Sequence, residues 1–356
     1  MNGCPYSFEC RATATPGQRI PERPEDPALP GVAGRSTLKA VDQAISSEMS
    51  EPGWRDCLSR DEIRELLQMR DLRSWISLGV DWGLVAAAMA LVAWQPGFVT
   101  IVFALFVIGA RQLGLAILMH EAAHRTLFAN RGVNDFVGRW FCAYPVWSDL
   151  EGYRGYHIQH HAWTGTAKDP DLGLITPFPI SKSSLRRKIF RDLSGATGRK
   201  FARAAWSRTG ARAVEDPRAR RAFVGFATTN LVLLALLTLA GHPELWLLWA
   251  AAWLTTNTLV TRIRAIAEHA LTPTDVPEPR GKTRTTIARP WERLLVAPNR
   301  VNFHLEHHLL MTVPHYNLPR LHQMLTERGA LSGACIDVGY AKVLRRASSR
   351  LKGTCV

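Results

Sequence analysis

The apolar residues of this 356-residue chain are concentrated in long runs separated by polar segments. The first run, residues 74–94, contains one charged residue, Asp81, and the second, residues 98–119, also contains one, Arg111. Each run is long enough to cross about 30 Å of hydrocarbon as an α-helix that rises about 1.5 Å per residue. Only the tripeptide QPG separates the two runs, and this predicts a helical hairpin.

A second pair of apolar runs covers residues 222–240 and 244–261, joined by the short turn GHPE. The last run is marginal in length, but its tryptophans are typical of membrane interfaces. Together the runs predict an all-α integral membrane protein with four transmembrane helices in two hairpins. We expect the remaining polar segments to form a helical cap on the cytoplasmic side.

The orientation follows from the distribution of charge. Residues 182–221 contain 13 Lys or Arg and three Asp or Glu, whereas the turns QPG and GHPE contain no Lys or Arg. Basic residues accumulate on the cytoplasmic side of membrane proteins. The long polar segments and both termini are therefore predicted to be cytoplasmic.

The net charge of +14 is also typical of nucleic-acid-binding proteins. Here, however, the basic residues flank apolar runs, where attraction to anionic lipid head groups explains them. No nucleic-acid-binding motif accompanies them. We therefore predict a membrane partner and no nucleic acid.

The ends and the cysteines add little chemistry. Residues 1–50 are polar and rich in proline, which predicts a disordered cytoplasmic tail, and they contain no apolar stretch typical of a signal peptide. A single membrane domain is predicted for residues 51–345, followed by a C-terminal tail at residues 346–356. The six cysteines form no C-x-x-C pair, so neither a disulfide framework nor a zinc ribbon is indicated.

The histidines carry the strongest chemical signal. Eight of the 12 fall in three short motifs, HEAAH, HIQHH and HLEHH. On a helix, positions i, i+3 and i+4 share one face, so each motif directs two or three imidazoles toward one point. The eight residues are His120, His124, His157, His160, His161, His304, His307 and His308.

An even number of predicted crossings separates the three motifs, so all eight imidazoles can meet on the cytoplasmic face. His269 follows the fourth crossing on the same side and is a ninth candidate ligand, although a histidine that caps or solvates a helix end is the alternative. A single catalytic zinc takes three protein ligands, whereas imidazole also suits iron. The number of histidines therefore favours a site for two metal ions.

Two other classes of protein deserve comparison. HEAAH alone satisfies H-E-x-x-H, the zinc protease pattern in which Glu121 would be the general base. An intramembrane zinc protease would leave HIQHH and HLEHH without a role, and a histidine-rich transporter should carry its ligands inside the crossings. Beside the other two motifs, Glu121 is predicted to be at most a partner that orients a histidine.

The order HEAAH, HIQHH, HLEHH around two hairpins resembles the three histidine boxes of the membrane fatty acid desaturase family. The resemblance covers roughly residues 70–325 and includes the DPDL stretch at residues 169–172 and MTVPHYNLP at residues 311–319. It implies two non-haem iron ions, held by the nine histidines, that activate O2 as co-substrate. The first box has three residues between its histidines, as in acyl-lipid, sphingolipid and bacterial members and some carotenoid oxygenases, and not four as in animal acyl-CoA desaturases.

The resemblance predicts a desaturase that inserts a double bond into the acyl chain of a lipid, in a bacterial inner membrane. The same ligands support other outcomes, so a carotenoid ketolase or hydroxylase, a hydrocarbon hydroxylase and an olefin-forming fatty acid decarboxylase remain alternatives. The chain has neither the H-P-G-G haem signature of a fused cytochrome b5 domain nor cysteine spacing for an iron–sulfur cluster. A separate ferredoxin or cytochrome b5-like donor, with its reductase, is therefore expected.

Five further polar residues are left outside the predicted site. Arg111 could contact a substrate carboxylate but more simply faces a cavity or extends to the interface, and Asp81 is given no role. The other three are histidines outside the motif spacing: His242 on the outer turn, His315 in a loop and His322 on a polar helix.

Overall fold

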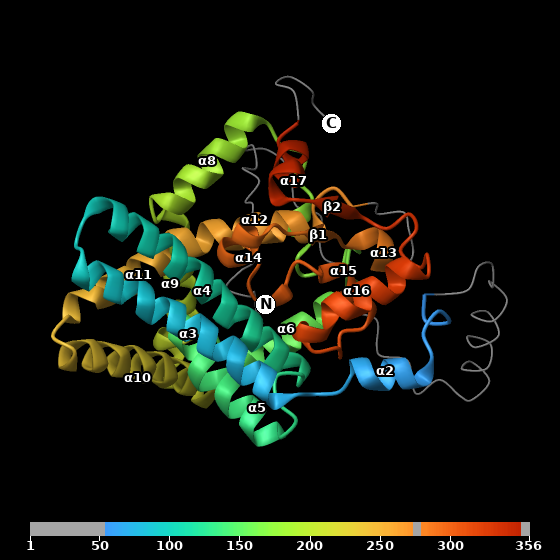
Figure 1. The fold of residues 1–356 in the computed structure, drawn as a ribbon. Helices are drawn as coiled ribbons and strands as arrows, with labels where there is room; N and C mark the ends of the chain where they lie inside the picture. Colours follow the sequence, from blue (N-terminus) through green and yellow to red (C-terminus); the bar gives the residue numbers. More distant parts are fainter. Residues whose placement is uncertain (1–53, 273–278, 350–356) are drawn as a thin grey trace, which may run out of the picture.

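The structure, a computed structural model, describes residues 54–272 and 279–349. The tail predicted for residues 1–50 lies outside these ranges, as do residues 350–356 of the predicted C-terminal tail. The described chain is mostly helical, in agreement with the predicted class. Figure 1 shows a group of long helices on one side and a cluster of shorter elements on the other.

The long helices come from the apolar runs. α3 (Asp71–Trp94) packs along α4 (Phe98–His124), to which residues 95–97 join it. α10 (Pro217–Leu239) is followed by the 3-10 turn η4 (Pro243–Leu245) and α11 (Trp246–Leu254). Trp94 at the end of α3 and Leu245 in η4 line the same groove, so the two connections lie at one end of the group (Figure 1).

Three helical stretches of the described chain are long and apolar enough to cross a membrane. They are Arg60–Trp94, which ends with α3, and the helices α4 and α10. The fourth predicted crossing, residues 244–261, differs because it is not one continuous helix. α11 ends at Leu254 after nine residues, and α12 (Thr256–His269) has 14, whereas a crossing needs about 20.

The break between α11 and α12 has a local cause and a tertiary one. The hydroxyl of Thr255 donates to the carbonyl four residues earlier at 2.6 Å, and that of Thr256 donates to the Leu105 carbonyl on α4 at 2.5 Å. Hydroxyls that bond to helix carbonyls tend to bend helices. Gly109 of α4 lies so close that a Cβ there would come within 2.7 Å of the Asn257 backbone nitrogen. α4 therefore packs directly against the backbone at the break.

The chain between α4 and α10 forms short helices, among which α6 carries the HIQHH motif. Asp149 caps the start of α6, because its carboxylate accepts a hydrogen bond from the Gly152 amide at 3.1 Å. The elements are α5 (Arg131–Val137), the π-helix η1 (Gly138–Ala143), η2 (Tyr144–Val146), α6 (Leu150–Trp163), α7 (Leu172–Ile175), α8 (Lys182–Leu193), α9 (Ala196–Arg208) and η3 (Gly210–Arg212).

The elements after α12 form the other half of the cluster. They are α13 (Pro279–Lys282), β1 (Thr285–Ile287), α14 (Pro290–Leu295), η5 (Pro298–Arg300), α15 (His304–Leu309), η6 (His315–Asn317), α16 (Leu318–Glu327), β2 (Ile336–Val338) and α17 (Tyr340–Ala347). β1 and β2 pair in parallel, with Thr285 opposite Ile336. α17 extends past residue 345, where the sequence suggested the end of the domain. From the other end of the chain, α2 (Arg60–Leu66) packs onto this cluster through buried Leu66.

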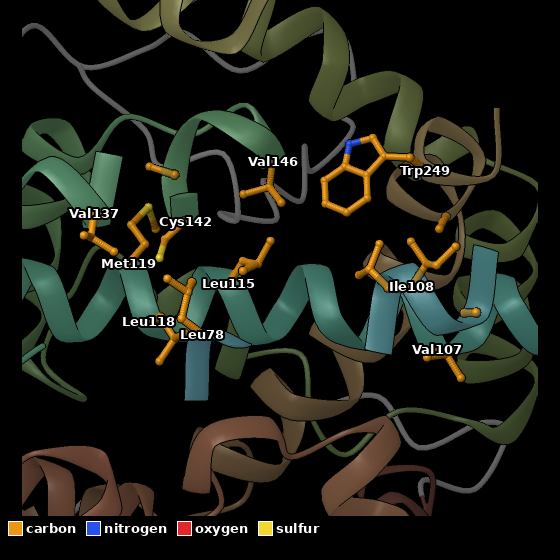
Figure 2. Packing of buried hydrophobic residues seen from close by; sticks show 14 of the residues in the cluster. Leu78, Val107, Ile108, Leu115, Leu118, Met119, Val137, Cys142, Val146 and Trp249 are labelled. Carbon is orange, nitrogen blue, oxygen red and sulfur yellow. The ribbon is translucent and has the colours of Figure 1, made fainter. Parts of the chain in front are cut away.

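Buried apolar side chains hold the helices together in three groups. The largest surrounds α4: Figure 2 shows Ile108, Leu115 and Met119 on the side of this helix that faces Trp249 of α11 and Cys142 and Val146, which follow α5. A second group joins α4 to α12 and α17, and a third joins α2, α15 and α16. α4 is therefore the central element, and its last turn enters the histidine cluster.

Candidate metal centre

All nine predicted ligands come together in the structure, and they divide into two groups. Within each group, one ring nitrogen of every histidine lies within 4.8 Å of those of the others. The first group contains His120, His124, His157, His161 and His307. The second contains His160, His269, His304 and His308.

The division follows from helical geometry. In HIQHH on α6, the i, i+4 pair His157 and His161 joins the first group, whereas His160 joins the second. HLEHH on α15 does the reverse, because its i, i+4 pair joins the second group and His307 joins the first. Positions i+3 and i+4 differ by about 100° around a helix axis with 3.6 residues per turn, so one short helix can serve two centres. α6 and α15 each bridge the two groups.

Within the first group, ring nitrogens point at one another over short distances. The Nε2 atom of His161 lies 2.9 Å from Nε2 of His157 and 3.0 Å from Nε2 of His307. Both ring nitrogens of His120 and Nε2 of His124 are buried, and they lack a hydrogen-bond partner among the described residues. Buried polar atoms without partners are costly, so Nε2 of His120 and Nε2 of His124 fit a bound cation.

The second group has the same character. Nε2 of His304 lies 2.8 Å from Nε2 of His269 and 3.1 Å from Nε2 of His308. One proton can bridge only one pair of these three Nε2 atoms. The lone pairs of the other close pair would then still repel each other. Four converging imidazoles are a donor set that suits iron, zinc or copper.

Polar atoms outside the two groups contact the Nδ1 atoms of some of these histidines and so fix the orientation of the rings. Asp169 accepts from Nδ1 of His160 at 2.8 Å, and its carboxylate is itself fixed by the Gly165 and Asp171 amides at 2.8 and 2.9 Å. Nδ1 of His269 lies 3.5 Å from the Lys282 carbonyl. A partner at Nδ1 directs the Nε2 lone pair inward, which is the arrangement found around metal-bound histidines.

Glu121 belongs to this outer layer, since neither histidine group includes it. Its Oε1 atom lies 3.3 Å from Nδ1 of His120. Its Oε2 atom accepts from the Thr126 hydroxyl at 3.0 Å and from the His315 backbone amide at 2.9 Å. Glu121 therefore connects the HEAAH turn to the loop at residues 310–317.

Comparison with known proteins identifies the family to which the chain belongs. A family model described as fatty acid desaturase matches residues 93–337, which include all nine histidines. The chain belongs to the fatty acid desaturase family. This confirms the resemblance that the three histidine motifs carry.

Two curated relatives agree with the assignment to the desaturase family. The chain is 27% identical over 306 residues to the dihydrorhizobitoxine desaturase of Bradyrhizobium elkanii, a match that covers 80% of this chain and 82% of the relative. It is 24% identical over 290 residues to the sn-1 oleoyl-lipid 12-desaturase of Synechocystis, covering 74% and 79%. Both relatives are desaturases, but their names indicate different substrates.

The protonation of the histidines in this desaturase-family protein suits metal binding. Burial lowers the pKa of His157, His304, His307 and His308 well below the ordinary value, so these imidazoles are neutral. Burial likewise lowers the pKa of His269 to about 3. His160 differs: burial acts to lower its pKa, but the bond to Asp169 and the nearby carboxylates raise it overall.

The remaining described histidines lie outside both groups. His242 is on the connection between α10 and η4, with its Nδ1 atom 3.0 Å from the Glu244 carboxylate. His322 on α16 is bonded to buried Glu306 of α15 at 2.6 Å. His315 begins the 3-10 turn η6 and is buried, with Nε2 2.9 Å from the Ser77 hydroxyl, a contact that its sequence spacing did not indicate. His315 and His322 thus contact elements that carry the histidine motifs, whereas His242 lies away from them.

A large groove in the described part of the chain is separate from the histidines. It has a volume of about 1140 Å³ and an almost wholly apolar lining from α3, α10 and the α5–η2 segment. None of the nine clustered histidines lines it. Its lining fits hydrocarbon chains, such as those of surrounding lipid.

Proposed function

We propose that the two histidine groups hold two iron ions, one in each, and that the protein desaturates the acyl chain of a lipid with O2 and two electrons. The convergence of nine histidines into groups of five and four carries this proposal. Iron bound there would supply the activation of O2 that removal of two hydrogens from an unactivated chain requires. Family membership supports the reaction type, and the oleoyl-lipid relative supports the substrate class.

The residues of the chain have three tasks in this function. The imidazoles other than His160 stay neutral and face inward, and the carboxylate of Asp169 fixes the His160 ring in its orientation. The burial of six of the nine rings keeps bulk water from the reacting centre. The rigid ends of α4, α6 and α15 hold the ligands at fixed spacing, which positions a bound chain against them.

The membrane arrangement is part of the proposal. α11 and the first turns of α12 together would complete a fourth crossing, bent at Thr255. The positive segment at residues 182–221 supports a cytoplasmic position for the histidines and both termini, in a bacterial inner membrane. In such an arrangement the acyl chain reaches the site from the lipid phase.

The electrons would come from a separate carrier. Within the described residues, no third cluster of His, Cys, Asp or Glu side chains could hold another metal. We propose a ferredoxin or cytochrome b5-like donor with its reductase. The purified chain with NADPH alone should not turn over, and addition of donor and reductase should restore activity; turnover without them would contradict this.

The decisive experiment is expression in a host with defined lipids, followed by mass spectrometry of the lipid extract. Loss of two hydrogens from an acyl chain, absent in a variant with His157 and His161 replaced by alanine, supports desaturation. Gain of an oxygen would instead assign a hydroxylase or ketolase, and a shortened terminal olefin would assign a decarboxylase. The zinc protease alternative has little support, because Glu121 is engaged by Thr126 and His315.

A further inference from the structure

A polar cleft lies on the opposite side of α6 from the histidine centre. It has a volume of about 450 Å³ and runs between α6 and the corner formed by α9, η3 and the start of α10. Its wall contains Ser148 and Gly155 from the α6 region and Arg212 from η3. Tyr153, one turn before His157, also lines it.

The side chain of Tyr153 lies between the cleft and the candidate metal centre. Its ring stacks on that of His157, with 5.2 Å between centroids and 10° between planes. Its centroid is also 6.3 Å from that of His120. A molecule in the cleft is therefore separated from the first histidine group by one aromatic ring.

Two polar side chains of the cleft wall lack a hydrogen-bond partner among the described residues. Ser148 is only 5% exposed, and its hydroxyl lacks a hydrogen-bond partner among the described residues. The guanidinium of Arg212 makes neither a hydrogen bond nor an ion pair in the described chain, although its charge acts on the Asp216 carboxylate. A hydroxyl and a guanidinium are the donors that recognise carboxylates and phosphates.

The acidic side chains of the cleft are already engaged. Asp149 accepts from the Gly152 amide and pairs with Arg218 at 2.7 Å. Asp216 caps α10, where it accepts from the Arg218 amide at 2.9 Å. Glu151 pairs with Arg139. Arg218 and Arg139 balance Asp149 and Glu151, whereas Asp216 keeps its charge near Arg212. The side chain of Arg212 is exposed, so an anionic ligand can still approach it.

Gly155 leaves the cleft open. Glycine inside a helix is less favourable than alanine, so it needs a reason. Its backbone has no positive φ, and a Cβ there would meet nothing within 4 Å, so neither conformation nor packing requires it. The missing side chain instead provides free volume on the wall of the cleft.

We propose that this cleft binds the anionic head group of the substrate, a carboxylate or a phosphate, between Arg212 and Ser148. The chain attached to that head group then lies beside Tyr153, next to the first histidine group. That the bound anion belongs to the substrate rests on the proposed function, but anion binding itself can be measured without turnover. The anion has two sources, a free fatty acid or a phospholipid, and they share the recognition chemistry.

The test is calorimetric titration of the purified full chain in a neutral detergent with laurate, monododecyl phosphate and dodecanol. Arg212→Gln should weaken binding of the two anions about 10-fold to 100-fold, as expected for hydrogen bonds to a charged group, and leave dodecanol unchanged. Arg203→Gln, which removes the same charge from α9 outside the cleft, should change nothing. The anion that binds more tightly identifies the source.

Gly155 supplies a second, uncharged test. Gly155→Leu should block anion binding, whereas Gly155→Ala should preserve it, with iron content equal in both. Unchanged affinity for both anions in Arg212→Gln and Gly155→Leu would overturn the inference. The binding test needs no turnover, so it is independent of the proposed reaction. Anion binding in a protein without desaturase activity would refute the proposed reaction but support the head-group site. Desaturase activity without anion binding in the cleft would refute only the head-group site.

Discussion

Asp81 on α3 and Arg111 on α4 form a buried ion pair, with 3.0 Å between Oδ1 and Nη1. Asn299 of η5 donates to the other carboxylate oxygen at 2.7 Å and to the Gly114 carbonyl at 3.0 Å. The two isolated charges of the first apolar runs therefore neutralise each other. They also connect α3 and α4 to the loop that precedes the HLEHH motif.

Loss of one partner in this pair should destabilise the protein strongly. In Asp81→Asn, Arg111 would keep a buried charge without compensation, and removal of one partner from a buried pair typically costs about 3–5 kcal/mol. We expect a clearly lower melting temperature in detergent. Glu244→Gln, at the exposed connection between α10 and α11, is the control and should change stability by less than about 0.5 kcal/mol.

A double-mutant cycle separates pairing from general damage. Adding Arg111→Met to Asp81→Asn removes the uncompensated charge, so the double variant should lose less stability than the sum of the single variants. The melting curves of all four proteins provide the measurement. Strictly additive losses would show that the two residues do not interact.

The close packing of α4 against the break between α11 and α12 leads to a second prediction. A Cβ at Gly109 would lie 2.2 Å from the Thr256 hydroxyl oxygen and 2.7 Å from the Asn257 nitrogen. Gly109→Ala should therefore cost about 1–3 kcal/mol through overpacking. Gly83→Ala on α3, where a Cβ meets nothing within 4 Å, should be neutral or stabilising. Equal melting temperatures of the two variants would contradict the close approach.

The two histidine groups should lose metal separately. Replacing His157 and His161 with alanine removes two ligands from the first group only, and replacing His269 and His304 removes two from the second only. Each double variant should retain about one iron per chain instead of two, measured by elemental analysis. His242→Ala, at the connection between α10 and α11, should retain both irons. Loss of both irons from either double variant would show that the groups do not bind metal independently.

The sequence predicted which histidines meet but not how they divide. Motif spacing and an even number of crossings placed all nine on one side of the protein. The assignment of His160 and His307 depends on how α6 and α15 are rotated against α4 and α12, and that rotation is set by packing distant in sequence. No local pattern encodes it.

Two other features could not be predicted from the sequence, for related physical reasons. Hydropathy averages over residues 244–261, so the hydroxyl bonds of Thr255 and Thr256 that interrupt the helix do not appear in it. The Asp81–Arg111 pair links positions 30 residues apart, and its partners depend on the register of α3 against α4. Helical periodicity predicts faces within one helix, whereas these contacts arise between helices.

Glu121→Gln distinguishes the desaturase from the protease suggested by HEAAH. Glutamine keeps one carbonyl oxygen, which can accept from the His315 amide or the Thr126 hydroxyl, so the loop and the ring of His120 should stay close to their positions. Loss of an orienting partner typically lowers metal affinity or activity 10-fold to 100-fold without abolishing it. We therefore expect reduced but measurable formation of the desaturated lipid, restored in part by added iron. A zinc protease would instead lose its general base and with it all peptide cleavage, so a variant that keeps full metal content but forms no desaturated lipid would contradict an orienting role for Glu121.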